Sequence, residues 1–552
     1  MLMFLLVAFL ASCILVLGLP ILAYFYDAKG FRKYPRQNVF SGLSPLAYGW
    51  EVGRPHHRIF NTQRLHARLA KDPVVRIGPN WLSFGRAAAV RDVYGFNSPC
   101  EKGGIYGALG SGGGAESLVL STAKAAHVQR RSVVAASYAA GNIRAWEPKV
   151  VDSTSTLVSK LDALCAAAPS SGADAVPEHE PTFDARLWSL LYSFECTIKI
   201  GLSKDMGLLA QGSDVVSVEL SKGITVRAPI IECLRSRSRA TATIVWDVAN
   251  FPWLKKATAL VSTWYERQWR NASIWSAWIE QATMERIERG KKGEYLEDLF
   301  QPMVQRAKGS ETEFCHIDRV AEVHQIVHGG GEKTGISIAN TLYYLLKHPE
   351  TLARLRGELD ESLTEDDAVA PWSKVKRMTY LRACVKESLR LSPPVASDLP
   401  RTTPRDRAYV VAGEAVPPGT DVSISAYTAH RDPAIFVDPE AFCPDRWIIT
   451  ADAERLRDMT AAYIPFSTGA RACVGRNLAL LMQLVFVATV VHRYDFALPS
   501  PDWTVEWEEC FTLWPRELPL KISKRQMNTQ SRVEGGVDRL VLQGAEKRNR
   551  TG

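Results

Sequence analysis

Residues 466–475 read FSTGARACVG and place one cysteine, Cys473, in a loop between two glycines. Glycine has no Cβ, so it lets the backbone turn tightly and approach a flat ligand. The apolar stretch 476–491 is predicted to be a helix, whose N-terminus would stabilise negative charge on the nearby sulfur. Arg471 can neutralise a carboxylate of the ligand. The loop predicts an iron-binding thiolate, although a free cysteine more often has a buried structural role.

The composition excludes other classes of protein. The chain has 552 residues, 46% of them hydrophobic and 23% charged, so it is long enough for one large domain or several smaller ones. Its net charge of +8 is spread without a long basic run, whereas nucleic-acid-binding proteins usually concentrate their charge. We therefore expect no nucleic acid partner; this charge suits an anionic membrane or an acidic protein. The ten scattered cysteines, without a Cys-x-x-Cys pair, indicate a reduced, cytosolic compartment.

The N-terminus is predicted to be a transmembrane anchor over residues 1–28. No residue from Leu2 to Tyr26 is charged, and that length is enough to cross a bilayer core of roughly 30 Å as a helix. Basic residues follow at Lys29, Arg32 and Lys33, so the positive-inside rule puts the rest of the chain in the cytosol. The alternative, a cleaved signal peptide, would have its basic residues first.

Between the two ends, apolar residues recur at three- and four-residue spacing, which predicts a mostly helical chain. The clearest helices cover residues 56–70, 123–136, 143–164, 258–289 and 476–491. Residues 74–77 and 81–84 are predicted to form a hairpin, and residues 408–412 to pair with residues 422–425 around a turn at 416–419. No βαβ alternation is present, so we expect a mainly α fold with small β-sheets.

Composition also marks the limits of the globular part. Residues 29–525 are predicted to form one domain. Residues 526–552 are polar with little apolar periodicity, which predicts a mobile tail. Residues 166–181 are rich in Ala, Ser, Pro and Gly and are predicted to be a surface loop.

Two charged residues, Glu387 and Arg390, stand three positions apart on one face of a predicted helix, where they can form an ion pair. Most such pairs lie on the solvated surface. This pair is followed by Ser392-Pro393-Pro394, which ends the helix, and by Arg446 within PDRW at residues 444–447.

A predicted helix over residues 319–347 contains HGGGEKTG at residues 328–335. Each glycine inside a helix costs about 1 kcal/mol relative to alanine. A helix that accepts three of them needs a close approach or a bend at this point. The alternative is a loop between two helices.

Together these motifs resemble those of the cytochrome P-450 family, over about residues 34–524. The loop 466–475 matches all five fixed positions of the family's haem-binding pattern, Phe-x-x-Gly-x-Arg-x-Cys-x-Gly. The pair at 387–390, PDRW at 444–447 and the glycine run at 328–335 are similar, in this order, to its Glu-x-x-Arg, Pro-Glu-Arg-Phe and oxygen-site elements. The resemblance implies a cytochrome P-450 fold behind the transmembrane helix.

The resemblance also implies a set of site residues. Cys473 would be the axial ligand of the iron of haem b (iron protoporphyrin IX), with Phe466 beside it. The haem-binding residues would be His127, Arg131, Arg401 and Arg471, with the last three as cations for the propionates. Glu387, Arg390 and Arg446 would form a buried structural triad, and residues 395–398 would face the substrate.

On the oxygen side, Glu332 falls on the family's acid position, whereas Lys333 stands where the family usually has threonine. The threonine hydroxyl helps relay protons to bound dioxygen. Thr334 lies about 100° further round the helix and substitutes only if the glycine run rotates or unwinds the turn. Both Lys333 and Thr334 remain candidates, as does chemistry that relies less on this relay.

The resemblance implies a monooxygenase that inserts one oxygen atom from O2 into a lipophilic small molecule. Electrons would come from NADPH through a separate reductase. The anchor resembles that of fungal microsomal members of secondary metabolism, which implies the endoplasmic reticulum membrane, a single pass and a cytosolic catalytic domain. FPWLKK at residues 251–256, with Trp264 and Trp269, would be a membrane-dipping substrate entrance or an ordinary amphipathic helix.

Two alternatives remain. One is a haem-thiolate enzyme that catalyses a rearrangement or dehydration without oxygen. The other is a non-catalytic, membrane-anchored haem protein.

Overall fold

The computed structural model of the chain describes residues 18–50, 57–69, 73–110, 117–166, 182–220, 223–305, 314–448 and 452–526. Nearly all of the predicted surface loop and tail, and most of the predicted anchor, lie outside these residues. Residues 18–26 are helical, and within the described ranges no helix is long and apolar enough to cross a membrane. The anchor over residues 1–28 therefore stays a prediction.

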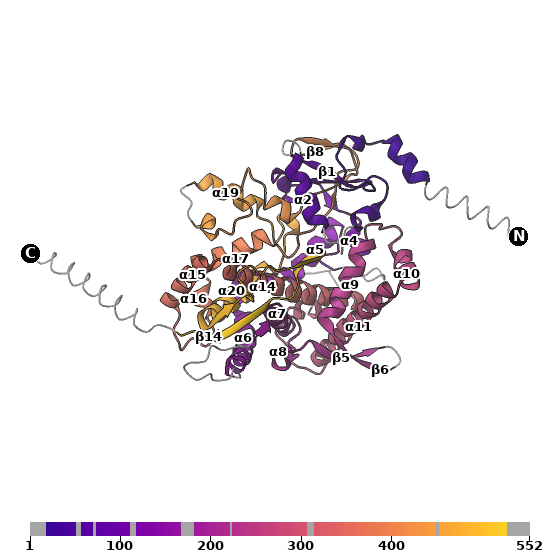
Figure 1. Cartoon of the computed structure of the whole chain (residues 1–552). Coiled ribbons are helices and arrows are strands. Elements are labelled where there is room, and N and C mark those ends of the chain that lie inside the picture. Colours follow the sequence, from indigo (N-terminus) through magenta and orange to yellow (C-terminus); the bar gives the residue numbers. More distant parts are fainter. Residues whose placement is uncertain are drawn as a thin grey trace, which may run out of the picture.

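Helices make up most of the molecule (Figure 1). Their bounds are α2 Arg58–Leu69, α3 Ala88–Tyr94, α4 Ile105–Ala108, α5 Lys124–Val134, α6 Ile143–Ala166, α7 Ala185–Leu202, α8 Leu208–Gln211, α9 Ile230–Ile244, α10 Phe251–Val261, α11 Thr263–Lys291, α12 Gln301–Val304, α13 His316–Val327, α14 Lys333–Lys347, α15 Pro349–Ser362, α16 Trp372–Val375, α17 Thr379–Leu391, α18 Ala426–Ala429, α19 Ala453–Ala462 and α20 Arg476–Arg493. α14 packs against α7, α17 and α20 near the middle of the molecule (Figure 1). Every residue of α20 from Leu481 to His492 is buried, as expected for a helix that is apolar on all sides. The main core is therefore built around α14 and α20.

The strands form small sheets, so the prediction of a mainly α fold with small β-sheets is confirmed. Their bounds are β1 Val74–Gly78, β2 Trp81–Phe84, β3 Glu101–Lys102, β4 Thr182–Asp184, β5 Val215–Leu220, β6 Ile224–Pro229, β7 Arg401–Thr402, β8 Tyr409–Val411, β9 Glu414–Val416, β10 Asp421–Ser423, β11 Tyr494–Ala497, β12 Trp507–Cys510, β13 Thr512–Pro515 and β14 Pro519–Lys524. The largest sheet has the order β1-β2-β10-β7-β3, and β1 and β2 form the predicted antiparallel hairpin.

The predicted pairing of residues 408–412 with residues 422–425 is wrong. β8 pairs with β9, because Ala412 (φ 48°) and Gly413 (φ 89°) form a two-residue turn with positive φ at both positions, which suits a hairpin. β10 pairs instead with β2 and β7 in the larger sheet.

The predicted helix over residues 258–289 is wrong at its start. The chain leaves the helical conformation at Ser262 (φ −143°, ψ 119°), and its hydroxyl accepts a hydrogen bond from the N–H of Tyr265. Ser262 therefore caps α11, and the residues before it belong to α10. The other predicted helices, now α2, α5, α6 and α20, are confirmed to within a few residues at each end.

The three glycines lie inside one continuous helix, which excludes a loop at this point. α13 leads into a single π-turn at His328–Glu332, and the π-turn leads into α14. A Cβ on Gly331 would stand 2.8 Å from the ring of Phe194 on α7, so glycine is required for this approach. The hydroxyl of Ser193 on α7 donates to the carbonyl oxygen of Gly331 at 2.5 Å, which satisfies a backbone group of the widened turn.

Candidate active site

The cysteine loop turns tightly between Phe466 and α20. Gly469 has a φ of 70°, and a Cβ there would stand 2.3 Å from the carbonyl oxygen of Tyr94, so this position requires glycine. The N–H of Cys473 donates to the carbonyl oxygen of Phe466 at 2.8 Å and closes the loop. Cys473 is a free cysteine that borders an internal cavity, and Phe466 borders the same cavity.

Two opposing effects act on the Cys473 thiol. Burial raises its pKa, while hydrogen bonds from the N–H groups of Gly475 and Arg476 and the positive charge of Arg131 lower it, with burial the stronger. The amides at the start of α20 therefore point at the sulfur, as the sequence predicted. A cation bound to the sulfur would complete the stabilisation of the thiolate.

The cavity beside Cys473 has a volume of about 460 Å³ and a mostly apolar lining. It extends from the cysteine loop along α5 to the π-turn and the first residues of α14, and it reaches α9 at another wall. A mostly apolar cavity with a few polar groups is the usual form of a site for a cofactor or a lipophilic ligand.

One wall of the cavity is lined by basic side chains. His127, Arg131 and Arg471, all predicted site residues, lie on it together with Lys102. Arg131 donates to the carbonyl oxygen of Ala472 at 2.8 Å, so α5 is joined to the cysteine loop. Burial, together with the charges of Arg471, Lys102 and Arg131, lowers the pKa of His127 to about 4. This wall favours an anionic ligand.

Arg401 lies behind this wall and does not line the cavity. Its guanidinium donates to the hydroxyl of Tyr106 at 2.9 Å and to the carbonyl oxygen of Pro400 at 3.1 Å. Lys102 stands opposite Arg401 in the β3–β7 pairing and borders the cavity instead. Burial lowers the pKa of Lys102 to about 6, helped by the charges of Arg401 and Arg471.

Glu332 is fully buried beside the cavity in a dense network of hydrogen bonds. One carboxylate oxygen accepts from the Nζ of Lys333 at 2.5 Å and bonds the Nε2 of His328 at 2.9 Å. The other accepts from the Nε1 of Trp514 at 2.9 Å and the hydroxyl of Thr512 at 3.3 Å. Burial alone would raise the pKa of Glu332, but Lys333 and His328 hold it well below its usual value.

Lys333 and Thr334 both border the cavity. Lys333 reaches back to Glu332 and forms an ion pair, while Thr334 is buried on the wall. The structure therefore brings together all three residues of the predicted oxygen side.

Of the four residues 395–398 that were predicted to face the substrate, Val395 and Ser397 line the cavity. Ala396 and Asp398 do not, because alternate residues of an extended segment point to opposite sides. Asp398 instead accepts hydrogen bonds from the hydroxyls of Ser423, at 2.7 Å, and Ser83, at 3.0 Å, beneath the large sheet. Its predicted place against the substrate is wrong.

A sequence model described as Cytochrome P-450 matches residues 103–520 of this chain. The chain belongs to the cytochrome P-450 family. It is similar to poxM, a cytochrome P-450 monooxygenase of Penicillium oxalicum, with 25% identity over 478 residues and 84% of each chain covered. It is also similar to the cytochrome P-450 monooxygenase AMT3 of Alternaria alternata, with 28% identity over 508 residues, covering 89% of this chain and 93% of the relative.

A solved structure shows the same fold. The crystal structure of the cytochrome P450DA haem domain superposes with a TM-score of 0.67 at 17% identity, covering 86% of this chain and 94% of that chain. The predicted cytochrome P-450 fold is therefore confirmed. The protein is an oxidoreductase of the cytochrome P-450 monooxygenase type.

The family implies a haem cofactor, and the residues around the cavity fit it. A free cysteine borders the cavity for the iron, and a wall of crowded cations is available for the two propionates. Burial and the neighbouring cations lower the pKa values of Lys102 and His127, and no described carboxylate raises either value, so an anionic ligand would favour their charged forms. Cys473, Arg131 and Arg471 would hold the haem together with these two residues. No signal in the sequence indicated Lys102, because only the pairing of β3 with β7 brings it to the cavity wall.

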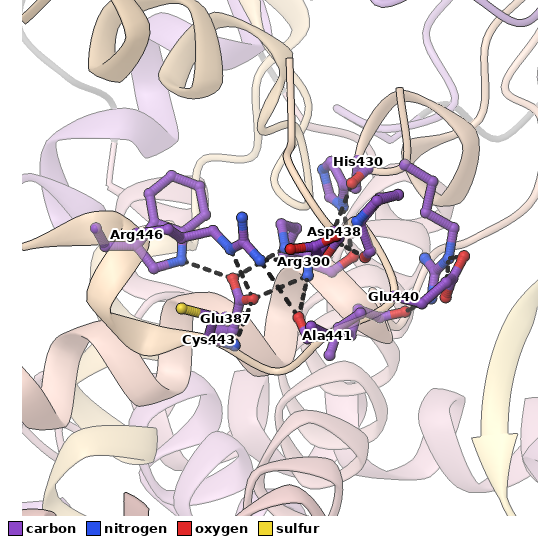
Figure 2. Close-up of polar contacts among 12 residues, drawn as sticks. Glu387, Arg390, His430, Asp438, Glu440, Ala441, Cys443 and Arg446 are labelled. Carbon is purple, nitrogen blue, oxygen red and sulfur yellow. Dashed lines mark hydrogen bonds and ion pairs between the residues drawn. The ribbon is translucent and has the colours of Figure 1, made fainter. Parts of the chain in front are cut away.

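Glu387, Arg390 and Arg446 form one buried network (Figure 2). The carboxylate of Glu387 accepts from the guanidinium of Arg390 at 2.8 and 2.9 Å and from the Nε of Arg446 at 2.9 Å. It also accepts from the N–H of Cys443 at 3.0 Å and the Nε1 of Trp447 at 2.8 Å. The carboxylate therefore fixes the irregular segment before the cysteine loop onto α17.

His430 extends this network to the cysteine loop and was also missed by the sequence analysis. Its Nδ1–H donates to the carbonyl oxygen of Arg390 at 2.9 Å, and its Nε2 accepts from the N–H of Ile464 at 2.8 Å. Burial lowers the pKa of His430 to about 3, so the ring stays neutral and keeps both bonds. Ile464 stands two residues before Phe466, so α17 positions the entry to the loop.

We predict that Glu387→Ala abolishes haem incorporation. The change leaves Arg390 and Arg446 buried without their carboxylate, which costs about 3–5 kcal/mol. The haem-to-protein ratio of the purified variant and its thermal unfolding check this. Glu440→Ala is the matched control, because Glu440 pairs with Arg431 in the same region but its side chain is 70% exposed, so we expect a loss of at most about 1 kcal/mol. Full haem content in Glu387→Ala would contradict the prediction.

A second prediction concerns Lys102 in the haem-free protein. Its pKa is about 6 in the folded chain against an ordinary 10.5, so between these values the unfolded chain holds a proton that the folded chain lacks. The free energy of unfolding must then rise with pH across this window. We expect Lys102→Met to remove this rise and to stabilise the haem-free protein near neutral pH by about 1–4 kcal/mol.

The same variant should lose haem faster to a haem scavenger, because it removes a cation from the propionate wall. Denaturant unfolding at several pH values and the rate of haem transfer measure the two effects. Lys124→Met, an exposed change at the start of α5, should show neither. Unchanged pH dependence together with unchanged haem transfer in Lys102→Met would refute the assignment.

Proposed function

We propose that this protein is a haem-dependent monooxygenase that inserts one oxygen atom from dioxygen into a lipophilic small molecule. The observation that carries the proposal is that Cys473 and Lys333, whose Nζ is paired with the carboxylate of Glu332, border the same mostly apolar cavity. Bound through the Cys473 thiolate, haem would supply the activation of dioxygen. The chain's own residues exclude water, bind the substrate and deliver protons.

Proton delivery is assigned to Lys333, Glu332 and His328. The Nζ of Lys333 is bonded to the carboxylate of Glu332, and the same carboxylate oxygen is bonded to the Nε2 of His328. Lys333 and His328 both border the cavity, so a proton held at Nζ can be delivered there and replaced through the carboxylate. This connected path supports Lys333 over Thr334, whose hydroxyl makes no hydrogen bond to Glu332 or His328 among the described residues.

The substrate class is proposed to be an intermediate of fungal secondary metabolism. The similar proteins come from Penicillium and Alternaria and are named cytochrome P-450 monooxygenases. The mostly apolar lining of the cavity supports a lipophilic molecule.

We propose that an NADPH–cytochrome P-450 reductase supplies the electrons. A basic group next to the cysteine loop, formed by Arg382, Lys386 and Arg476, supports this partner. Burial, together with the charges of Arg476 and Arg382, lowers the pKa of Lys386 to about 8. An acidic protein surface would relieve this crowding and would be steered to the cysteine side of the molecule.

The proposed location is the endoplasmic reticulum membrane, with the anchor over residues 1–28 and a cytosolic catalytic domain. α10 supports it, since none of its residues is buried and Trp253, Leu260 and Val261 are 72%, 87% and 82% exposed. α10 and the helical residues 18–26 both lie on the right of Figure 1. Such a face suits insertion into the headgroup region of a bilayer.

Two measurements test the function. A shifted Soret band after reduction under carbon monoxide would show a haem thiolate, and its absence would overturn the proposal. Turnover under ¹⁸O₂ with the reductase should label the product with one ¹⁸O atom. An unlabelled product would favour the alternative of an oxygen-independent rearrangement or dehydration, and haem without turnover would favour a non-catalytic protein.

We further predict that Lys333→Met lowers the product formed per NADPH consumed by about tenfold or more, because it removes the proton donor. Lys333→Thr, which supplies a hydroxyl at this position, should retain more of the coupling than Lys333→Met. NADPH consumption and product are measured for both variants, with the carbon monoxide band as the control for intact haem. If Thr334→Val uncouples the enzyme and Lys333→Met does not, Thr334 is the donor and the assignment is wrong.

A further inference from the structure

α9 carries three arginines at alternate positions, Arg235, Arg237 and Arg239. At 100° per residue, Arg235 and Arg239 lie on the same side of the helix, while Arg237 points the opposite way. Arg235 and Arg239 both pair with Glu508 on β12, and Arg239 also pairs with Glu232. Their charges are therefore compensated.

Arg237 borders the cavity and has no such compensation. Within the described ranges, its guanidinium makes one hydrogen bond, from NH2 to the carbonyl oxygen of Leu109 at 3.2 Å. Burial alone lowers the pKa of Arg237, and no described carboxylate acts to raise it. A guanidinium has five N–H groups, so most of its donor capacity is available to a ligand.

The polar groups near Arg237 do not supply a negative charge. Its charge lowers the pKa values of His324 and His328, which shows that it lies close to both. The Nδ1 of His324 accepts from the Nε1 of Trp275 at 3.2 Å, so this ring is neutral. The carboxylate bonded to His328, that of Glu332, is already paired with Lys333. Arg237 thus borders the cavity without a described carboxylate that compensates its charge.

We infer that the substrate is a lipophilic carboxylic acid whose carboxylate binds Arg237 while its apolar part lies in the rest of the cavity. A guanidinium binds a carboxylate through two parallel hydrogen bonds, and a single carboxylate balances its single charge. Ser238 and Thr241, one and four residues after Arg237 on α9, border the same cavity. A neutral ester or ketone would leave the buried charge uncompensated. This inference rests on the proposed function, because it takes the cavity as the substrate site.

The test uses the full-length, haem-loaded protein and matched probes. Saturated fatty acids of eight to sixteen carbons, and the methyl ester of each, are titrated while the Soret band is followed. We expect at least one acid to bind about tenfold or more tightly than its own ester. Arg237→Gln should reduce this ratio to near one by weakening the acid while leaving the ester unchanged.

Two further variants control for structure. Arg239→Gln removes a guanidinium from the same helix without touching the cavity, and Arg235 remains to pair with Glu508, so the preference for the acid should persist. Arg237→Lys keeps the charge without the planar guanidinium and should keep part of the preference. It also serves if Arg237→Gln does not fold with haem.

Two results would overturn the inference. One is a wild-type protein that binds no acid of the series better than its ester. The other is an acid preference that survives in Arg237→Gln. The carbon monoxide spectrum of each variant is recorded separately, so a failure of haem binding, which would count against the proposed function, is distinguished from a failure of carboxylate recognition.

Discussion

The structure around the cysteine depends on one buried carboxylate, that of Glu387. An unpaired carboxylate at this depth would be very unfavourable, so its donors must stay in place. Those donors come from α17 and from residues 443–447, which are thereby fixed against each other. His430 then joins the carbonyl oxygen of Arg390 to the N–H of Ile464. The position of Cys473 is therefore set by α17, far from it in the sequence.

What could be predicted from the sequence was mostly local. The cysteine loop, the Glu387–Arg390 pair and the main helices depend on residues within a few turns of one another, and short-range patterns reveal them. Lys102 and His430 reach the site through strand pairing and tertiary hydrogen bonds, which no local pattern contains. The wrong partner for β10 has the same origin, because a strand's neighbour is decided by the whole sheet.

The oxygen-side helix shows how a local irregularity changes the candidates. Glycine at 331 lets α7 approach, and the π-turn at His328–Glu332 accommodates one additional residue. One additional residue turns the following helix by about 100° relative to α13, which equals the offset between neighbouring positions. Lys333 and Thr334 can then both border the cavity, as observed. From the sequence, a role for Thr334 required a rotation of the helix at the glycine run, and a π-turn at His328–Glu332 produces such a rotation.

The charges around the cavity limit which ligands it can bind. Lys333 is paired with Glu332, whereas no described carboxylate raises the pKa of Lys102 on the propionate wall or of Arg237. Desolvated cations destabilise a folded chain unless anions join them, and any anion that binds only the folded state stabilises it. Haem propionates would compensate the first group but leave Arg237 uncompensated on its own wall. If the site bound only neutral hydrocarbons, the charge of Arg237 would stay uncompensated. The electrostatic argument that supports haem propionates at the basic wall therefore also supports an acidic substrate at Arg237.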